Sequence, residues 1–193
     1  MPGLTMDHEI KTQNGWKSFE DIDIDQDEIY VLHFYESEYC HRIYPDTSYL
    51  TPLSLNICLD YQGDFYTINN CGVDFQVTSD YPLPVNIPNT GCSYSGQARH
   101  YDIDSIINIL SKAKSQPEDE RDEVKLYSEF NNDILTDYEK NESWYQQIEI
   151  GLDDIQKNHL ENVGIFNFTF PKTDSKTTYL INVRRNEFGE CWV

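Results

Sequence analysis

The chain has 193 residues, of which 38% are hydrophobic and 13% aromatic, enough for one well-packed domain or two small ones. Fourteen Lys and Arg against thirty-four Asp and Glu leave a formal charge of −20, which argues against binding to nucleic-acid phosphates or anionic membranes. No stretch approaches the roughly 18 apolar residues that span a bilayer, and residues 1–4 lack signal-peptide features. We therefore expect an intracellular or virion-associated protein.

Cysteine usage indicates free thiols. The five cysteines are an odd number and include no C-x-x-C pair, which argues against a disulfide framework and a structural zinc site. The sequence also lacks a Gly-rich phosphate loop, an H-E-x-x-H motif and a nucleophile elbow. We accordingly predict no cofactor and no bound metal.

Residues 5–101 are predicted to be mostly β. Runs rich in β-branched and aromatic residues lie at 29–35, 65–68 and 73–77 and are separated by Asn, Gly and Pro. Asn14-Gly15 is a dipeptide suited to the two positive φ angles of a tight turn, so residues 10–19 are predicted to form a hairpin.

The acidic run that follows resembles a calcium loop only superficially. Asp21, Asp23 and Asp25 alternate, but Gln26 stands where the sharp-turn glycine belongs and Leu32 where a bidentate glutamate belongs. A solvated acidic connection is the preferred interpretation.

The character of the chain changes after residue 101. Four apolar residues recur at helical spacing, with Asp102 or Asp104 as the cap, and predict a helix that ends near Ser115: Ile103, Ile106, Ile107 and Leu110. A second apolar stripe, from Val124 to Ile155, predicts one or two further helices.

The tail returns to strands, with alternating runs at 165–170 and 177–183. The predicted fold is a β-rich body formed by residues 1–101 and 162–193, with an acidic helical insert at 102–161, which makes the chain α+β overall. The acidity of the insert argues against a DNA-binding endonuclease.

The most informative stretch is the beginning. Leu4 to Ile22 contain Thr5-x-x-His8 followed by the predicted hairpin, and this stretch resembles the T-x-x-H block of the hedgehog/intein (Hint) family. The resemblance implies that Thr5 and His8 belong to a self-cleavage centre, in which the histidine polarises the scissile peptide and protonates the leaving amide nitrogen.

Two further stretches are similar to that family. Residues 60–85 contain a Y-x-G-x-x-Y strand and a second T-x-x-H block, in which Tyr81 replaces the histidine. Residues 179–193, with Arg184-Arg185 and Trp192, resemble the closing strands of intein-like domains in viral and phage proteins. The resemblance implies that the first and last strands of the β body meet in space.

The chain also departs from the family. Splicing needs a nucleophilic Cys or Ser at the first position and a terminal Asn that cyclises, and the sequence as written has neither. Self-contained splicing is therefore not expected. Three explanations remain: the larger piece of a split intein, a fragment of a processed precursor, or a Hint-like scaffold kept for binding or structure.

These observations lead to three hypotheses for function. The first is a non-catalytic interaction or assembly module, plausibly of a viral or phage particle, whose partner is another protein. The second is a processing element that is active with a complementary intein segment. The third is an acidic mimic of nucleic acid, in which the D-x-D-x-D run presents three carboxylates on one face of a strand. Candidate interaction residues are Trp16, Asp21, Asp23, Asp25, Arg184, Arg185 and Trp192.

A simpler interpretation of the T-x-x-H block is open as well. Thr5 and His8 precede a predicted hairpin, so a capping threonine and a surface histidine would explain them without any chemistry.

Overall fold

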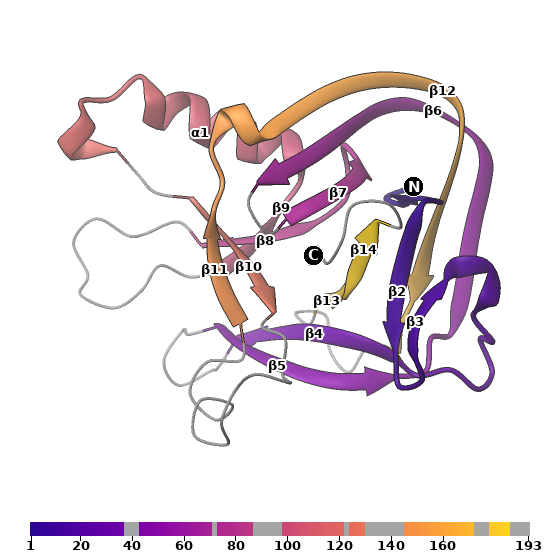
Figure 1. Ribbon diagram of the computed structural model, residues 1–193. Helices are drawn as coiled ribbons and strands as arrows, with labels where there is room; N and C mark the ends of the chain where they lie inside the picture. Colours follow the sequence, from indigo (N-terminus) through magenta and orange to yellow (C-terminus); the bar gives the residue numbers. More distant parts are fainter. Residues whose placement is uncertain are drawn as a thin grey trace.

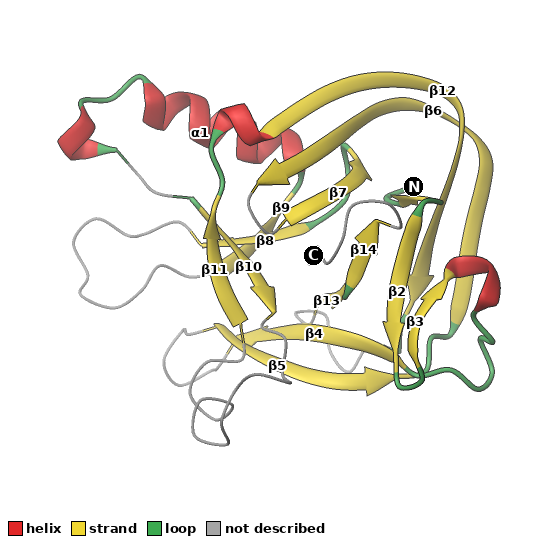
Figure 2. Ribbon diagram, viewed as in Figure 1, coloured by secondary structure: helices red, strands yellow, loops and turns green. Residues whose placement is uncertain are grey.

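A computed structural model describes residues 1–36, 43–70, 73–86, 98–121, 124–129, 145–171 and 178–185. Strands dominate (Figure 2), as predicted, with one α-helix in the described part, α1 (Ile103–Lys114). Three short 3-10 helices are η1 (Phe19–Asp21), η2 (Glu118–Glu120) and η3 (Leu152–Asp154). The strands are β1 (Leu4–Thr5), β2 (His8–Thr12), β3 (Gly15–Ser18), β4 (Ile29–Glu36), β5 (Ile43–Leu50), β6 (Ser54–Asn70), β7 (Val73–Thr78), β8 (Leu83–Asn86), β9 (Ala98–Tyr101), β10 (Lys125–Glu129), β11 (Tyr145–Glu149), β12 (Ile155–Thr169), β13 (Thr178–Ile181) and β14 (Val183–Arg185).

The strands form three sheets. β1, β12, β6 and β7 close into a ring, and β11, β10, β8 and β9 form a second sheet in that order. In the third, β13, β4, β2 and β14 are neighbours, with β3 added to β2 and β5 to β4. β6 and β12 run antiparallel as one long curved ribbon that connects the region of β2 and β3 with that of α1 (Figure 1).

The beginning and the end of the described chain share a sheet. β2 pairs with β14, so that Glu9 lies opposite Arg184 and His8 opposite Arg185. The expectation that the first and last strands meet is confirmed, and the T-x-x-H block consequently borders the arginine pair.

The hairpin of β2 and β3 is confirmed, although its turn differs from the predicted one. Thr12 pairs with Gly15, so the turn consists of Gln13 and Asn14. Gly15 has a φ of 107°, whereas Asn14 does not have a positive φ. Glycine at a positive φ after a two-residue turn is the bulged form of hairpin, which needs one such residue and not two.

The predicted helix at 103 is confirmed as α1. The carboxylate of Asp102 caps it by accepting the backbone N–H of Ser105 at 2.7 Å. The apolar stripe of the helix is buried, with Ile103 and Ile106 fully enclosed. The spacing rule therefore identified both the helix and the face that it buries.

The prediction of further helices between Val124 and Ile155 is wrong where the structure describes the chain. β10 and β11 form an antiparallel pair, with Leu126 opposite Ile148, and β12 begins at Ile155. β10 also pairs with β8, where Leu126 lies opposite Val85. These distant pairings outweigh a local helical pattern. The middle of the stripe, 130–144, lies outside the described residues.

The core gathers side chains from the sheets and from α1. Its fully buried members include Leu4, Ile10, Phe75, Ile106 and Phe166, and Phe19 stacks on Phe166 with ring centres 4.9 Å apart. The division into a body and an insert at 102–161 stays a prediction, while β12 runs without a break across residue 161. In the described ranges no helix has the length and apolar character needed to cross a membrane.

Candidate functional site

The T-x-x-H block forms the turn between β1 and β2, inside the protein. Thr5 is 5% exposed and His8 is fully buried. The interpretation of His8 as a surface histidine is therefore wrong. Burying an imidazole and a hydroxyl costs free energy unless each has hydrogen-bond partners, and both have them here.

Both ring nitrogens of His8 are bound. The backbone N–H of Gln76 on β7 points at Nε2 at 3.3 Å, so Nε2 is an acceptor. Nδ1 lies 2.8 Å from the carbonyl oxygen of Thr5 and 3.2 Å from its Oγ1. With Nε2 accepting, the contact with the carbonyl requires the proton on Nδ1. This assignment fixes the tautomer and the orientation of the ring.

Thr5 orients its neighbours and is not activated as a nucleophile. Its Oγ1 donates to Oδ1 of Asp7 at 2.5 Å, so the hydroxyl proton is directed at a carboxylate and not at His8. A histidine that acts as base on a hydroxyl must accept from it, and Nδ1 has the opposite role here. Thr5 and His8 instead hold the Nδ1–H of His8 and the Oγ1 of Thr5 in fixed positions relative to the surrounding backbone.

Asp7 connects the turn to the last strand. Nε and Nη2 of Arg185 on β14 lie 2.8 and 2.7 Å from its Oδ2. Partial burial acts to raise the pKa of Asp7, but the hydrogen bonds with His8, Thr5 and Arg185 outweigh it. The pKa of Asp7 therefore lies well below its ordinary value.

A second turn, Thr78 to Tyr81, follows β7 and repeats part of this arrangement. Oγ1 of Thr78 donates to Oδ1 of Asp80 at 2.6 Å and accepts the backbone N–H of Gly3 at 2.9 Å. Tyr81 takes the position of the histidine; it is 7% exposed, and burial raises the pKa of its hydroxyl.

Sequence reasoning assigned no role to Asp7, Gln76 or Thr78. Asp7 and Thr78 had a signal, because both blocks have the pattern Thr-x-Asp and an aspartate two residues after a threonine can accept its hydroxyl proton. Gln76 had none, since it acts through its backbone N–H.

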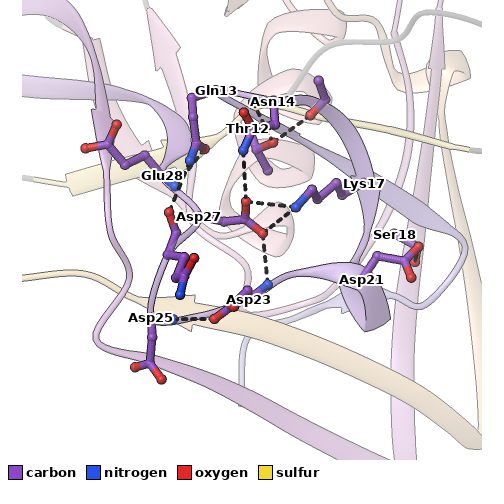
Figure 3. A network of polar contacts seen from close by, with 12 residues as sticks. Thr12, Gln13, Asn14, Lys17, Ser18, Asp21, Asp23, Asp25, Asp27 and Glu28 are labelled. Atoms are coloured by element: carbon purple, nitrogen blue, oxygen red, sulfur yellow. Dashed lines mark hydrogen bonds and ion pairs between the residues drawn. The ribbon is translucent and has the colours of Figure 1, made fainter.

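The acidic run is held by internal hydrogen bonds (Figure 3). The carboxylate of Asp27 is buried; it accepts from Nζ of Lys17 at 2.7 and 2.8 Å and from the backbone N–H of Asp23 at 2.9 Å. Burial acts to raise the pKa of Asp27, but the hydrogen bond from Lys17 and further contacts lower it overall. Ser18 donates to Asp21, and Asp23 accepts the backbone N–H of Asp25.

The positions of these residues contradict one premise of the nucleic-acid mimic hypothesis, that the D-x-D-x-D run is a strand. Asp21 ends the 3-10 helix η1, and Asp25 lies in a turn, so the three carboxylates do not line one face of a strand. The run forms a loop connection that is stabilised by the hydrogen bonds of the buried Asp27.

Of the remaining candidate interaction residues, Trp16 and Arg184 lie in the described part of the chain. The guanidinium of Arg184 lies 4.5 Å from the centre of the half-buried Trp16 ring, and its Nε is 2.6 Å from Oε2 of Glu9. Both residues are thus part of the sheet that contains β2, β3 and β14. Trp192 lies outside the described residues. In the ranges that the structure describes, no three His, Cys, Asp or Glu side chains form a group suited to a metal ion.

Comparison with protein-family models and with curated proteins finds no match. Solved structures with a similar fold include a splice-inactive variant of the AceL NrdHF class 3 split intein, at 14% identity over 93% of this chain and 96% of that one, with a TM-score of 0.47. The DnaX mini intein from Spirulina platensis is similar at 12% identity over 93% and 97%, with a TM-score of 0.45. An intein from a hyperthermophile is similar at 8% identity over 96% and 97%, with a TM-score of 0.49. All three of these structures are inteins.

Proposed function

We propose that this chain is the larger part of an intein-type protein-processing element. In this proposal His8 acts on a peptide bond at a junction, Thr5 and Asp7 position it, and other segments supply the attacking nucleophile and the second junction. The partner is a complementary protein segment, which either flanks residues 1–193 or is encoded separately.

One observation carries the proposal: the polar network of Thr5, Asp7, His8 and Arg185, in which Thr5 and His8 are buried while the side chain of Asp7 is 44% exposed. A binding scaffold has no need of a fully buried imidazole and a carboxylate whose pKa is held low, and apolar side chains would fill the same space at lower cost. Perturbed ionisable groups gathered in the interior are typical of reactive sites. We therefore prefer processing to the non-catalytic assembly module.

The geometry suggests how His8 would contribute. It already contacts one backbone N–H, that of Gln76, and its Nδ1 proton is directed at a peptide carbonyl. A histidine held in this way can polarise a carbonyl, and after protonation it can deliver a proton to the nitrogen of a departing amide. Asp7 would balance the positive charge that His8 then carries. Steps of this kind contribute about 10²- to 10⁴-fold to a rate.

The test is intact mass spectrometry of the full natural reading frame, co-expressed with the neighbouring frames. We expect a cleaved or joined product from the unchanged protein. His8→Gln, which keeps a hydrogen-bonding side chain but cannot be protonated near neutral pH, is expected to abolish the product. The matched control is His159→Gln, because His159 is an exposed histidine on β12 that contacts Asp64.

The outcomes distinguish the two leading functions. Loss of product in His8→Gln but not in His159→Gln, with both proteins folded by circular dichroism, supports processing. If no product forms in any of the proteins, processing is rejected and the assembly module becomes the preferred function.

A further inference from the structure

The first half of β6 is a sheet edge with an apolar face. Residues 54–64 of β6 pair with β12 on one side, and pairing with β7 begins only at Phe65. Within the described ranges, no strand occupies the other side of residues 54–64, although the carbonyl of Asp64, at its end, accepts from the backbone N–H of Ser79 at 3.2 Å. Every second residue of this stretch therefore directs its backbone N–H and C=O away from the sheet.

Large apolar side chains accompany this open edge. Leu53 is 67% exposed, Ile57 47% and Leu59 72%. Leu55 and Ile57 alternate along the strand and thus share one face of the sheet, and Leu59 follows at a register shift of the β6–β12 pair between Cys58 and Tyr61. On the neighbouring strand, Phe168 and Phe166 lie opposite Leu55 and Ile57; Phe166 is buried in the core and Phe168 is half-buried, so the apolar surface open to an added strand consists of the β6 side chains.

Most of the usual protection of a sheet edge is missing here. Exposed edges are commonly blocked by lysine, proline, an inward-pointing charge or a β-bulge, which prevents pairing with other chains. β6 contains no Lys, Arg or Pro, its charged residues are Asp60 and Asp64, and its register with β12 shifts between Cys58 and Tyr61 but is regular over residues 54–58. An apolar edge of this kind is either an aggregation hazard or a binding site.

We infer that the open edge of β6, residues 54–64, binds an extended, basic segment of a protein partner by strand addition. Backbone hydrogen bonds would supply affinity, and alternate apolar side chains of the partner would pack on Leu55, Ile57 and Leu59. Asp60 and the net charge of −20 favour lysine and arginine on the partner's other face, whereas Asp64 is paired with Lys157 and His159. The same charge disfavours a second copy of this chain as the occupant. The edge would bind such a strand whether or not the chain processes proteins.

A peptide probe tests this inference directly. The probe is a capped, fluorescein-labelled twelve-residue peptide of alternating valine and lysine, titrated into the full chain and followed by fluorescence anisotropy. We expect saturable binding with one peptide per chain, and nuclear magnetic resonance shifts confined to β6 and its neighbour β12. A peptide of the same composition that repeats Val-Val-Lys-Lys has the same charge without strand alternation, and it should bind at least about tenfold more weakly, a difference of about 1.4 kcal/mol.

Variants of the exposed residues locate the site. The double change Ile57→Thr and Leu59→Thr keeps strand propensity and net charge, and it is expected to weaken binding at least about tenfold. Gln156→Thr, at an exposed position of β12, is the control and should change affinity less than about twofold. Circular dichroism confirms that each variant is folded.

Three results would overturn the inference. Equal binding of the two peptides would indicate general attraction to an acidic surface. Unchanged binding by the double variant would place the site elsewhere. A dimer that sedimentation detects in the unchanged protein and not in the double variant, without peptide binding, would assign the edge to a second copy of the chain.

Discussion

Two turns of this molecule, residues 5–8 and 78–81, contain the same hydrogen bond from a threonine to an aspartate but differ in the residues around it. In each, a buried threonine donates its hydroxyl proton to an aspartate two residues later, Thr5 to Asp7 and Thr78 to Asp80. The strands before them pair, with Leu4 opposite Val77. The same local geometry is thus used on both sides of one strand pair.

Each turn also binds a backbone N–H of the opposite strand, by different means. The second turn uses Oγ1 of Thr78 to accept from Gly3, whereas the first uses the imidazole of His8 to accept from Gln76. Asp7 is bound by Arg185, whereas Asp80 is paired with the N-terminal amino group, 3.4 Å from its Oδ2. The hydrogen bond from threonine to aspartate therefore has a structural role in both turns. The capacity of the first turn for chemistry comes from His8 and its charged neighbours.

The largest expected difference between the turns concerns processing. His8→Ala should lower the yield of the processed product by about 10²- to 10⁴-fold, because the proposal assigns the proton transfer at the junction to the imidazole. Tyr81→Phe in the second turn removes only a hydroxyl and should leave processing unchanged. Time courses by intact mass spectrometry measure both, and a loss in Tyr81→Phe similar to that in His8→Ala would show that the turns act together.

The threonines should matter for stability in both turns. Thr78→Val is expected to lower the free energy of unfolding by about 1–3 kcal/mol, because the buried N–H of Gly3 loses its acceptor. Thr5→Val should cost about 1 kcal/mol, since the carbonyl of Thr5 still accepts from His8. Urea unfolding measures these values, and a larger cost at Thr5 would reverse the assigned roles.

Sequence reasoning predicted most of this framework, and its failures have a common cause. The hairpin of β2 and β3, the helix α1 with its cap at Asp102 and the main strands depend on short-range patterns. Those patterns are written in neighbouring residues, and they were identified correctly. The local pattern of β10 and β11 predicts helix, but β10 pairs with β8, some forty residues earlier, and β11 pairs with β10.

The site could be predicted only in part, because some of its contacts join residues that are far apart in the sequence. The T-x-x-H pattern identified Thr5 and His8 but could not show that they are buried, nor that Gln76 on β7 binds the imidazole. Arg185 was singled out, but its partner Asp7 lies 178 residues earlier. Contacts over such distances follow from strand pairing, which no local spacing shows.

Lowering the pH should change the contributions of Asp7 and Asp80 to stability by different amounts. Since the folded pKa of Asp7 lies below its unfolded value of about 3.9, its stabilising contribution is complete above that pH and is lost as the pH falls through the folded pKa. Asp7→Asn should therefore destabilise the protein by about 1 kcal/mol at pH 6, discounted for its partial exposure, and by less below pH 4. Urea midpoints across pH test this, with Asp80→Asn as the matched control, for which we expect a smaller loss at pH 6. A loss for Asp7→Asn that does not change with pH would contradict the assignment.

The smallest effect should come from the arginine that only the first turn has. Arg185→Lys keeps the charge but loses one of the two contacts with Oδ2 of Asp7, so we expect a loss of about 0.5 kcal/mol. Thermal unfolding at low and high salt measures this loss. If the variant is as stable as the unchanged protein, the second contact has no energetic role.

The pairing of β2 with β14 also has a consequence for biosynthesis. Glu9 and its partner Arg184 are 175 residues apart, so at about 5–20 residues per second β2 waits roughly 10–35 s on the ribosome before β14 is made. Until then the turn at Asp7 lacks its arginine, and the sheet around β2 is incomplete. A nascent chain arrested before residue 178 should therefore be cut by proteases at β2, whereas release of the whole chain should protect it. Assembly of the site is thus delayed until synthesis of residues 1–185 is complete.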